Sequence, residues 1–347
     1  MIYIDGSANS GSGTIVRSAV ALACLLGEDL HISNIRAKRE KPGLRPQHLA
    51  DIMACAQMCN AQVTGATVNS KEVIFKPGER IRGGHYDWDI GTAGSTTLLA
   101  MTTLPLALFA DRDTSVQISG GLFQDFAPSA HYMQHVLSPT LRKMGIHVNS
   151  KVVRPGYVPK GAGILQLGIN PLTTRLQPLN LPYQGAIEKI EGLAISSHLK
   201  KQRVSHRMAE ECKKVLASKG HHSQINTLYD DTAAQAGASL AVWAITDSGC
   251  LLGADWAGKQ SRSSESIGRY VATNLLDDLS AGATVDRHLA DQLIIFAALA
   301  QGATRYFVPQ ITEHVNTNLW LVRKFGAQTQ VKDNHLIIEG IAHISHS

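Results

Sequence analysis

The stretch that decides the fold is a strand, a short turn and a helix, which read Thr304-Arg305-Tyr306-Phe307-Val308, then Thr312-Glu313-His314-Val315-Asn316-Thr317-Asn318, then Leu319-Trp320-Leu321-Val322. The first run is rich in β-branched and aromatic side chains, and the last has helical apolar spacing. His314 therefore lies at a strand-to-helix junction, where unpaired backbone N–H groups favour anions. A neutral imidazole nitrogen is basic near neutral pH and can attack a phosphate. The alternative is a surface histidine that caps the helix.

The same order of elements recurs three times along the chain, as helix, strand, helix, strand and strand. The first unit is predicted at residues 15–27, 29–35, 46–59, 61–68 and 72–76. The second unit is predicted at 95–110, 114–119, 129–144, 146–153 and 162–168. The third unit is predicted at 285–301, 303–308, 314–325, 327–331 and 335–340. Because the helices have apolar spacing and the strands alternate or run apolar, we expect two helices packed on a β-sheet in each unit.

A different stretch, residues 184–278, separates the second unit from the third. It predicts, in order, a strand at 187–195, a helix at 201–218, strands at 222–228, 237–246 and 250–254, and a helix at 264–278. The polar, proline-containing segment 170–183 is the expected linker. We therefore expect an α+β fold in which three repeated α/β units form the main body and a smaller α/β domain is inserted. The expected divisions are 1–183, 184–278 and 279–347.

Composition limits the class of protein. The 347 residues are 44% hydrophobic and 18% charged, which is enough apolar material for a core and is not typical of a disordered chain. The longest apolar runs are too short to span a bilayer, and the N-terminus begins with a strand-like segment rather than a signal peptide. The five cysteines form no C-x-x-C pair, and Cys55 and Cys59 are expected to be buried on one helix face. These features predict a reduced, cytoplasmic protein without a membrane partner.

Two polar features suggest a phosphate-containing ligand. The net charge is +5, and basic residues gather at Arg36, Lys38, Arg39, Lys41 and Arg45. Such a cluster suits either a polyanionic partner or a solvated face. Glycine-rich turns recur at predicted helix starts, including residues 10–14, 91–96, 119–121 and 161–163. They allow close approach to a phosphate, although none has the Walker A or dinucleotide-binding pattern.

In their order along the chain, these segments resemble the RNA 3′-terminal phosphate cyclases. The matching stretches cover nearly the whole sequence and are Asp5-Gly6, Gly11, Arg17-Ser18-Ala19, Arg36-Ala37-Lys38-Arg39, Lys41-Pro42-Gly43-Leu44, Gln47-His48-Leu49, Arg82-Gly83-Gly84, Ile90-Gly91-Thr92-Ala93-Gly94-Ser95, Ser119-Gly120-Gly121, Ala127-Pro128, Gly156-Tyr157-Val158-Pro159-Lys160-Gly161-Ala162-Gly163, Leu289-Ala290-Asp291-Gln292-Leu293, His314 and Thr317-Asn318. The family's three related α/β units and inserted domain agree with the repeat pattern described above.

The resemblance implies an ATP-dependent ligase that acts on RNA with a 3′-phosphate end. His314 would attack the α-phosphorus of ATP, expel pyrophosphate and form a histidine–AMP phosphoramidate. The AMP would pass to the RNA 3′-phosphate, and the neighbouring 2′-OH would then displace AMP to give a 2′,3′-cyclic phosphodiester. These steps divide a difficult dehydration into transfers with good leaving groups and require positive charge around crowded phosphates.

The resemblance also implies roles for individual residues. The positions implied to bind ATP or phosphate are Arg17, Gln47, Pro128, His288, Asp291 and Gln292. Those implied to bind the RNA end are Arg36, Arg39 and Lys41. Planar guanidinium groups suit bidentate phosphate binding. Pro128 would flank the adenine on one face and His288, where the family usually has tyrosine, on the other.

The sequence departs from the family at its first glycine-rich loop. Ser10 stands where the family has the glutamate that holds a divalent metal, Thr14 stands where it has glutamine, and Ala162 interrupts a later triple glycine. A serine hydroxyl is a poor ligand for a hard dication, so the metal, Mg²⁺ or Mn²⁺, is expected to be held mainly by ATP phosphates and its protein ligand is unknown.

Two alternatives follow from these departures. One is a catalytically weak or inactive cyclase-like protein that acts as an RNA-binding or assembly factor. The other is an enolpyruvyl transferase, a class with a related repeat architecture whose substrate motifs are not visible here. The RNA substrate is open, as is the oligomeric state, for which a homodimer is possible.

Overall fold

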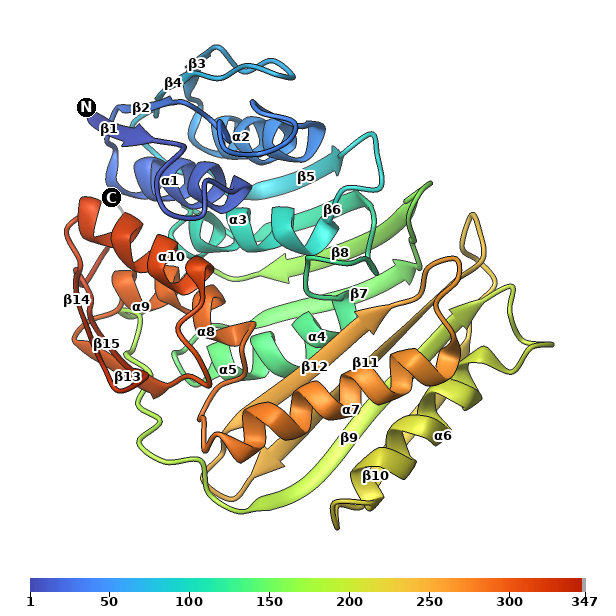
Figure 1. The fold of residues 1–347 in the computed structure, drawn as a ribbon. Helices are drawn as coiled ribbons and strands as arrows, with labels where there is room; N and C mark the ends of the chain where they lie inside the picture. The colour runs from blue at the N-terminus through green and yellow to red at the C-terminus, as the bar shows by residue number, and fades with distance from the viewer. Residues whose placement is uncertain (345–347) are drawn as a thin grey trace.

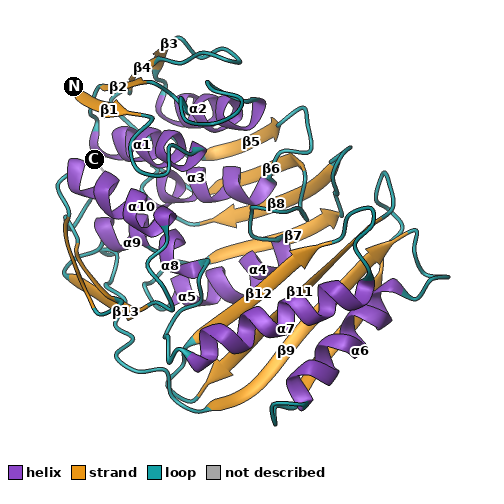
Figure 2. Cartoon of the chain, viewed as in Figure 1, coloured by secondary structure: helices purple, strands orange, loops and turns teal. Residues whose placement is uncertain are grey.

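The protein, seen in a computed structural model that describes residues 1–344, has a mixed α+β architecture with four β-sheets in that range (Figure 1). The expected α+β class is therefore confirmed. Helices α1 (Gly13–Leu26), α2 (Pro46–Cys59), α3 (Thr96–Leu108) and α10 (Glu313–Lys324) pack against one another in its interior. This helical layer brings the start of the chain next to its last helix, as Figure 2 shows.

The first two sheets have the same strand order. The first sheet runs β1 (Ile2–Asp5), β2 (Leu30–Ser33), β4 (Val73–Lys76) and β3 (Gln62–Thr64). The second runs β5 (Gly84–Asp89), β6 (Thr114–Gly120), β8 (Gly163–Ile169) and β7 (Val148–Arg154). In each sheet the first pair is parallel and is connected by a helix, whereas the other pairs are antiparallel. Strand β5 was not predicted, although its buried Tyr86 and Trp88 alternate with polar residues.

The third sheet is smaller and antiparallel. Its order is β13 (Ala303–Phe307), β15 (His335–Glu339) and β14 (Gln328–Lys332). The expected strand and helix on either side of His314 are present as β13 and α10. The predicted helix at 285–301 is wrong in extent, because the chain forms only α8 (Leu289–Gln292) and α9 (Ile294–Leu299). Asp286 Oδ1 accepts the backbone N–H groups of His288 and Leu289, so the helix begins after this cap.

The predicted helix at 129–144 is also interrupted. It consists of α4 (Ala130–Tyr132), a π-helical turn (Met133–Leu137) and α5 (Ser138–Arg142). Ser138 donates its backbone N–H to the carbonyl of Met133, five residues earlier. Pro139 follows and has no N–H to donate to His135, so the α-helical bonding pattern cannot continue through this point.

The fourth sheet packs beside this interrupted helix. It runs β10 (Ser223–Tyr229), β9 (Ile187–Ser197), β11 (Gly237–Thr246) and β12 (Leu251–Ala257). Helices α6 (Val204–Ala217) and α7 (Ser264–Ser280) lie side by side on one face of the sheet (Figure 2). Gly253 in β12 allows close packing, since a Cβ there would lie 2.6 Å from Val136 Cγ2. Tyr132 also donates its buried hydroxyl to Asp286, which in turn accepts the N–H of Gly253.

Two compositional predictions can be compared with this fold. No helix among residues 1–344 is long and apolar enough to cross a membrane. All five cysteines are buried and free, including Cys55 and Cys59 on α2, which confirms their assignment as core thiols.

Candidate active site

The start of α10 presents His314 to a cavity of about 560 Å³. Thr312 caps the helix by accepting the Val315 N–H at 3.1 Å, which leaves His314 in the first turn. The side chain is exposed and lines the cavity together with residues of α1, α3, α8, the loop before α4 and the β12–α7 connection. The expected strand-to-helix junction therefore becomes one wall of a cavity, with the helix N-terminus close to it.

Thr14 connects His314 to Arg17. Its Oγ1 is 3.4 Å from His314 Nδ1 and accepts a hydrogen bond from Arg17 Nη2 at 3.2 Å. A hydroxyl oxygen has two lone pairs and can accept from both groups. When Nδ1 carries the proton, it donates to Thr14 Oγ1 and the lone pair of Nε2 is available, since no described residue bonds to Nε2. Thr14, a departure from the family pattern, thus occupies a position that orients the imidazole.

Thr317 joins α10 to the first glycine-rich loop. Its Oγ1 lies 2.9 Å from Ser10 Oγ and 2.6 Å from the carbonyl oxygen of Glu313, and it accepts the Ser10 N–H at 3.3 Å. Ser10 Oγ in turn donates to Ser12 Oγ at 2.9 Å. Because these hydroxyls are buried and already bonded to each other, they fix the loop beside His314.

Asn318 connects the same helix to α1 and α8. Its Nδ2 donates to the backbone oxygen of Asp291 at 3.3 Å and lies 3.4 Å from Asp291 Oδ2, while its Oδ1 accepts from Ser18 Oγ at 3.2 Å. Burial raises the pKa of Asp291, and the nearby His314, His288 and Arg17 act in the opposite direction. The motif His314, Thr317 and Asn318 is therefore one histidine facing the cavity and two residues that hold its helix in place.

Pro128, His288 and Gln292 also line the cavity. Burial raises the pKa values of Asp255, Asp286 and Asp291, and His288 acts in the opposite direction on all three. Gln292 is 8% exposed, and its Oε1 has no hydrogen-bond partner within residues 1–344. A buried acceptor without a donor at a cavity wall is costly unless a ligand or water supplies the hydrogen, so this position suits a ligand N–H.

Six of the ten predicted site residues line this cavity: Arg17, Pro128, His288, Asp291, Gln292 and His314. The other four, Gln47, Arg36, Arg39 and Lys41, lie outside its lining. Gln47 donates Nε2–H to the carbonyl of Ser95 at 3.1 Å and accepts the Ser95 N–H through Oε1. Its amide therefore fastens α2 to the turn before α3.

The basic loop is also partly bonded to its own backbone. Arg36 Nη1 donates to the carbonyl oxygens of Lys41 at 2.8 Å and Gly43 at 2.9 Å, while Arg36 itself has a left-handed φ of 54°. Arg39 is exposed and donates Nη2–H to the carbonyl of Ser10 at 3.0 Å, so it covers the back of the first glycine-rich loop. Lys41 is exposed. Within this group, Arg39 is the residue that contacts the first glycine-rich loop, which lies beside His314.

A buried carboxylate beside Arg17 was not predicted. Asp51 on α2 is fully buried, and the side chains of Gln47 and Thr102 lie near its carboxylate and act to lower its pKa. Burial raises the pKa of Asp51 to about 7, and the charge of Arg17 acts against this increase. The apolar spacing of α2 gives no sign of this group, because position 51 falls on the buried face of an otherwise ordinary amphipathic helix.

The residues present do not form a protein-held metal site. Within residues 1–344 no group of three or more His, Cys, Asp or Glu side chains has an arrangement that could hold a metal ion. Ser10 supplies a hydroxyl that is bonded to Ser12 and Thr317, where a hard dication would require carboxylate or other oxygen ligands free to coordinate it.

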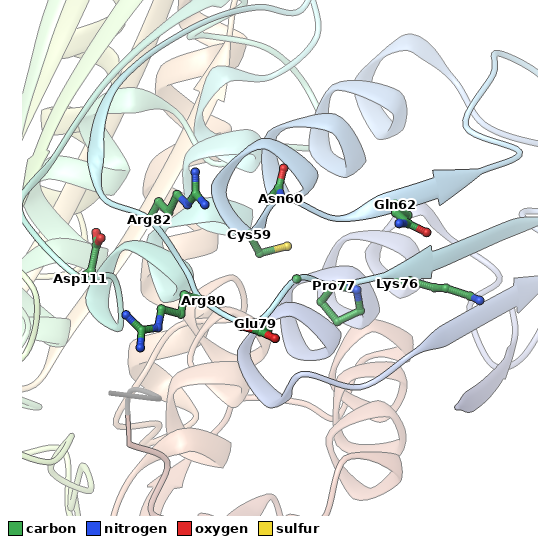
Figure 3. A pocket seen from close by; sticks show the side chains of 10 residues that line it. Cys59, Asn60, Gln62, Lys76, Pro77, Glu79, Arg80, Arg82 and Asp111 are labelled. Atoms are coloured by element: carbon green, nitrogen blue, oxygen red, sulfur yellow. The ribbon is translucent and has the colours of Figure 1, made fainter.

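A second cavity, of about 630 Å³, lies where β4 leads into β5 and contains no predicted site residue. Figure 3 shows its charged side chains, which include Lys76, Glu79, Arg80, Arg82 and Asp111. These five residues are exposed, and Cys59 contributes a buried wall. The cavity combines both signs of charge around open solvent and has no feature that selects a particular ligand.

Comparison with known proteins identifies the family. A family described as RNA 3′-terminal phosphate cyclase matches residues 8–331. The chain is similar to proteins named RNA 3′-terminal phosphate cyclase from two archaea: Archaeoglobus fulgidus, with 36% identity over 340 residues (98% of this chain, 100% of the relative), and Pyrococcus furiosus, with 39% identity over 334 residues (96% of this chain, 95% of the relative). A relative of the same name from Caldivirga maquilingensis is 37% identical over 330 residues, covering 94% of this chain and 92% of the relative. The chain belongs to the RNA 3′-terminal phosphate cyclase family.

Proposed function

We propose that this protein is an RNA 3′-terminal phosphate cyclase, which uses ATP to convert the 3′-phosphate of an RNA into a 2′,3′-cyclic phosphodiester. One observation carries the proposal: an exposed histidine in the first turn of a helix faces a cavity, and Thr14 connects it to Arg17. This combination supplies a nucleophile, an orienting group and a cation at one place.

In the first step, His314 Nε2 attacks the α-phosphorus of ATP. A P–N bond forms, the bond between the α-phosphorus and its bridging oxygen breaks, and pyrophosphate leaves with the bonding electrons. Nδ1–H donates to Thr14 Oγ1 during this step, which fixes the tautomer and supports the positive charge that develops on the ring. Arg17 stabilises the negative charge on the phosphate oxygens.

In the next two steps the AMP is transferred from the protein to the RNA, and the RNA end then cyclises. An oxygen of the RNA 3′-phosphate attacks the phosphorus of the histidine–AMP, and His314 leaves as neutral imidazole. The 2′-OH then attacks the activated 3′-phosphorus, loses its proton and displaces AMP, which closes the cyclic diester. Each step forms one P–O bond and breaks one bond to a good leaving group, so charge stabilisation and positioning are sufficient.

The cavity wall supports a role for the nucleotide-binding residues. Pro128 and His288 are proposed to hold the adenine, and the Gln292 Oε1 acceptor is proposed to receive an N–H of the nucleotide. Arg36, Arg39 and Lys41 are proposed to attract the RNA end. Because Gln47 already bonds through both amide atoms to Ser95, its proposed contribution to phosphate binding is through the position of that turn.

The proposal includes the organisation of the chain. The shared strand order of the first two sheets, and the antiparallel β13–β15–β14 sheet, support three repeated units. The separate β10–β9–β11–β12 sheet supports an inserted domain over 184–278, between body segments 1–183 and 279–347.

Intact mass spectrometry tests the first step. Wild-type protein incubated with ATP and Mg²⁺ or Mn²⁺ should gain the mass of one AMP, and His314→Asn, which keeps a polar side chain of similar reach, should gain none. Equal modification of both proteins would overturn the assignment of His314.

A non-catalytic RNA-binding or assembly factor remains the second candidate because Ser10 replaces the metal-holding carboxylate. For that function, neither protein would gain AMP with either metal ion, while 3′-phosphorylated RNA would still bind.

A further inference from the structure

Phe126 stands at the rim of the His314 cavity with its side chain uncovered. It lines the cavity, its relative exposure is 102%, and its backbone has a left-handed φ of 66°. A single exposed apolar residue needs no function. This residue, however, combines full exposure with a backbone conformation that bulky L-residues rarely adopt, and such positions persist where the surrounding structure holds them.

The residues on both sides of Phe126 are anchored to the neighbouring part of the molecule. Asp125 receives two hydrogen bonds from Arg262, at 2.8 and 2.9 Å, and the Arg262 guanidinium lies 3.5 Å from the centroid of the Trp256 ring. The side chain of Arg262 is 7% exposed, which makes this a largely desolvated pair. On the other side, Ser129 donates its N–H to half-buried Asp255. The loop therefore presents the phenyl ring from a fixed base.

Phe126 is a different part of the cavity lining from the residues proposed to hold the adenine. Pro128 is half-buried and His288 is exposed, and the Phe126 side chain is fully uncovered. Three cations line the same cavity, Arg17, Lys259 and Arg262, and the side chain of Lys259 is 65% exposed. An exposed aromatic ring beside cations is the arrangement with which proteins bind single-stranded nucleic acid, because the ring stacks on a base and the cations meet the backbone.

We propose that Phe126 is the platform on which the base of the RNA's 3′-terminal nucleotide stacks, so that the terminal phosphate is directed toward His314. The inference rests on the proposed function, since it assigns the RNA substrate to the same cavity. It makes Phe126 a positioning residue that recognises a base of any identity, because every base has a stacking face.

Equilibrium binding with two oligonucleotides tests this role. One is a 3′-phosphorylated RNA, and the other is the same RNA with an abasic ribose at its 3′-terminal nucleotide. Phe126→Ala should weaken binding of the first roughly tenfold, from loss of one base–aromatic stack. It should leave binding of the abasic RNA unchanged, because the partner of the ring is already absent. Phe126→Trp should restore affinity for the complete RNA. Tyr183→Ala, which removes an aromatic side chain that is 65% exposed and does not line the cavity, is the matched control.

Adenylylation of the same variants separates this inference from the proposed function. Phe126→Ala should gain AMP at the wild-type rate. The inference is overturned if Phe126→Ala weakens both RNAs equally, weakens neither, or slows AMP transfer from ATP, the last result placing the ring at the ATP base. Failure of the wild type to gain AMP overturns the catalytic proposal alone, since the binding comparison does not depend on it.

Discussion

The cavity around His314 and the basic loop at residues 36–45 contain similar kinds of side chain but use their polar atoms differently. In the cavity, His314 is held through Nδ1 while Nε2 is available, and the Gln292 Oε1 has no partner within the described chain. In the loop, Arg36 is bonded to two backbone carbonyls, and Gln47 just beyond it is bonded to both polar atoms of the Ser95 peptide. A polar residue is available to a ligand only where the fold has not already paired it.

The difference arises from where the residues lie in their elements. His314 is the second residue of α10 and Arg17 is the fifth residue of α1, and both line the cavity. In the loop before α2 several carbonyl groups accept backbone N–H groups, and Arg36 supplies the donor for two more, those of Lys41 and Gly43. The same residue type can therefore serve a ligand in one region and the backbone in the other.

The largest effect should come from removing the cavity's arginine. Arg17→Ala should lower the rate of AMP transfer to His314 by about 10²–10³-fold, the range expected for loss of one group that stabilises transition-state charge. Arg17→Lys should recover part of the rate, because it restores charge without the planar fork. The measurement is single-turnover adenylylation. If Arg17→Ala lowers the adenylylation rate by less than a few fold, the arginine of the cavity contributes no more to this step than the arginines of the basic loop.

Gln47→Ala should instead lower stability. It leaves the N–H of buried Ser95 without a partner, whereas the Ser95 carbonyl still accepts the Leu99 N–H, so the free energy of unfolding should fall by about 1–3 kcal/mol. Gln47→Glu keeps one acceptor and should lose about half as much. Urea denaturation measures the change. A Gln47→Ala protein of wild-type stability with a raised KM for ATP would make Gln47 a ligand residue after all.

The raised pKa of the buried Asp51 carboxyl group, beside Arg17, predicts that stability depends on pH. Its pKa is raised from 3.8 to about 7 in the folded state, so folding is favoured when the carboxyl is protonated. Stability from this group is therefore present at low pH and is lost as pH rises from about 4 toward 7. Asp51→Asn, which cannot ionise, should be more stable than the wild type by as much as about 4 kcal/mol at pH 8 and nearly equal at pH 4. The test is urea unfolding at both pH values; a constant difference between the proteins would contradict the assignment.

Arg39→Ala should have the smallest effect and tests whether the basic loop meets RNA at all. Binding of 3′-phosphorylated RNA should weaken by roughly three- to tenfold through loss of one phosphate contact, and binding of the same RNA with a 3′-hydroxyl should change less. Lys38→Ala, an exposed neighbouring cation, is the control. Equal losses for both RNA ends would assign Arg39 to general attraction of the polyanion.

Much of the fold follows from local sequence, because apolar spacing and turn residues act over short distances. Helix α2 occupies the predicted residues, and β13 and α10 flank His314 as expected. The prediction errors occur where the hydrogen bonding of one residue interrupts a helix that the apolar spacing predicts to be continuous. Pro139 forces a π-helical turn, and the cap made by Asp286 shortens the helix that follows it.

The candidate site shows the same limit. The resemblance to the family identified six of the residues that line the cavity, among them His314 and Arg17. They gave no sign that Gln47 bonds to Ser95, since this pairing depends on how α2 meets the turn before α3. Asp51 and Phe126 also escaped notice, because burial and exposure are properties of the assembled fold rather than of neighbouring residues in the chain.

A pulse–chase experiment tests the central claim most directly. The protein is labelled with ATP carrying ³²P at the α-phosphate, freed of ATP, and then mixed with 3′-phosphorylated RNA. The account predicts that label first resides on His314 and then leaves the protein as AMP, in amounts equal to the 2′,3′-cyclic phosphate formed. Label that stays on the protein while RNA is cyclised, or cyclisation by His314→Asn at the wild-type rate, would contradict it.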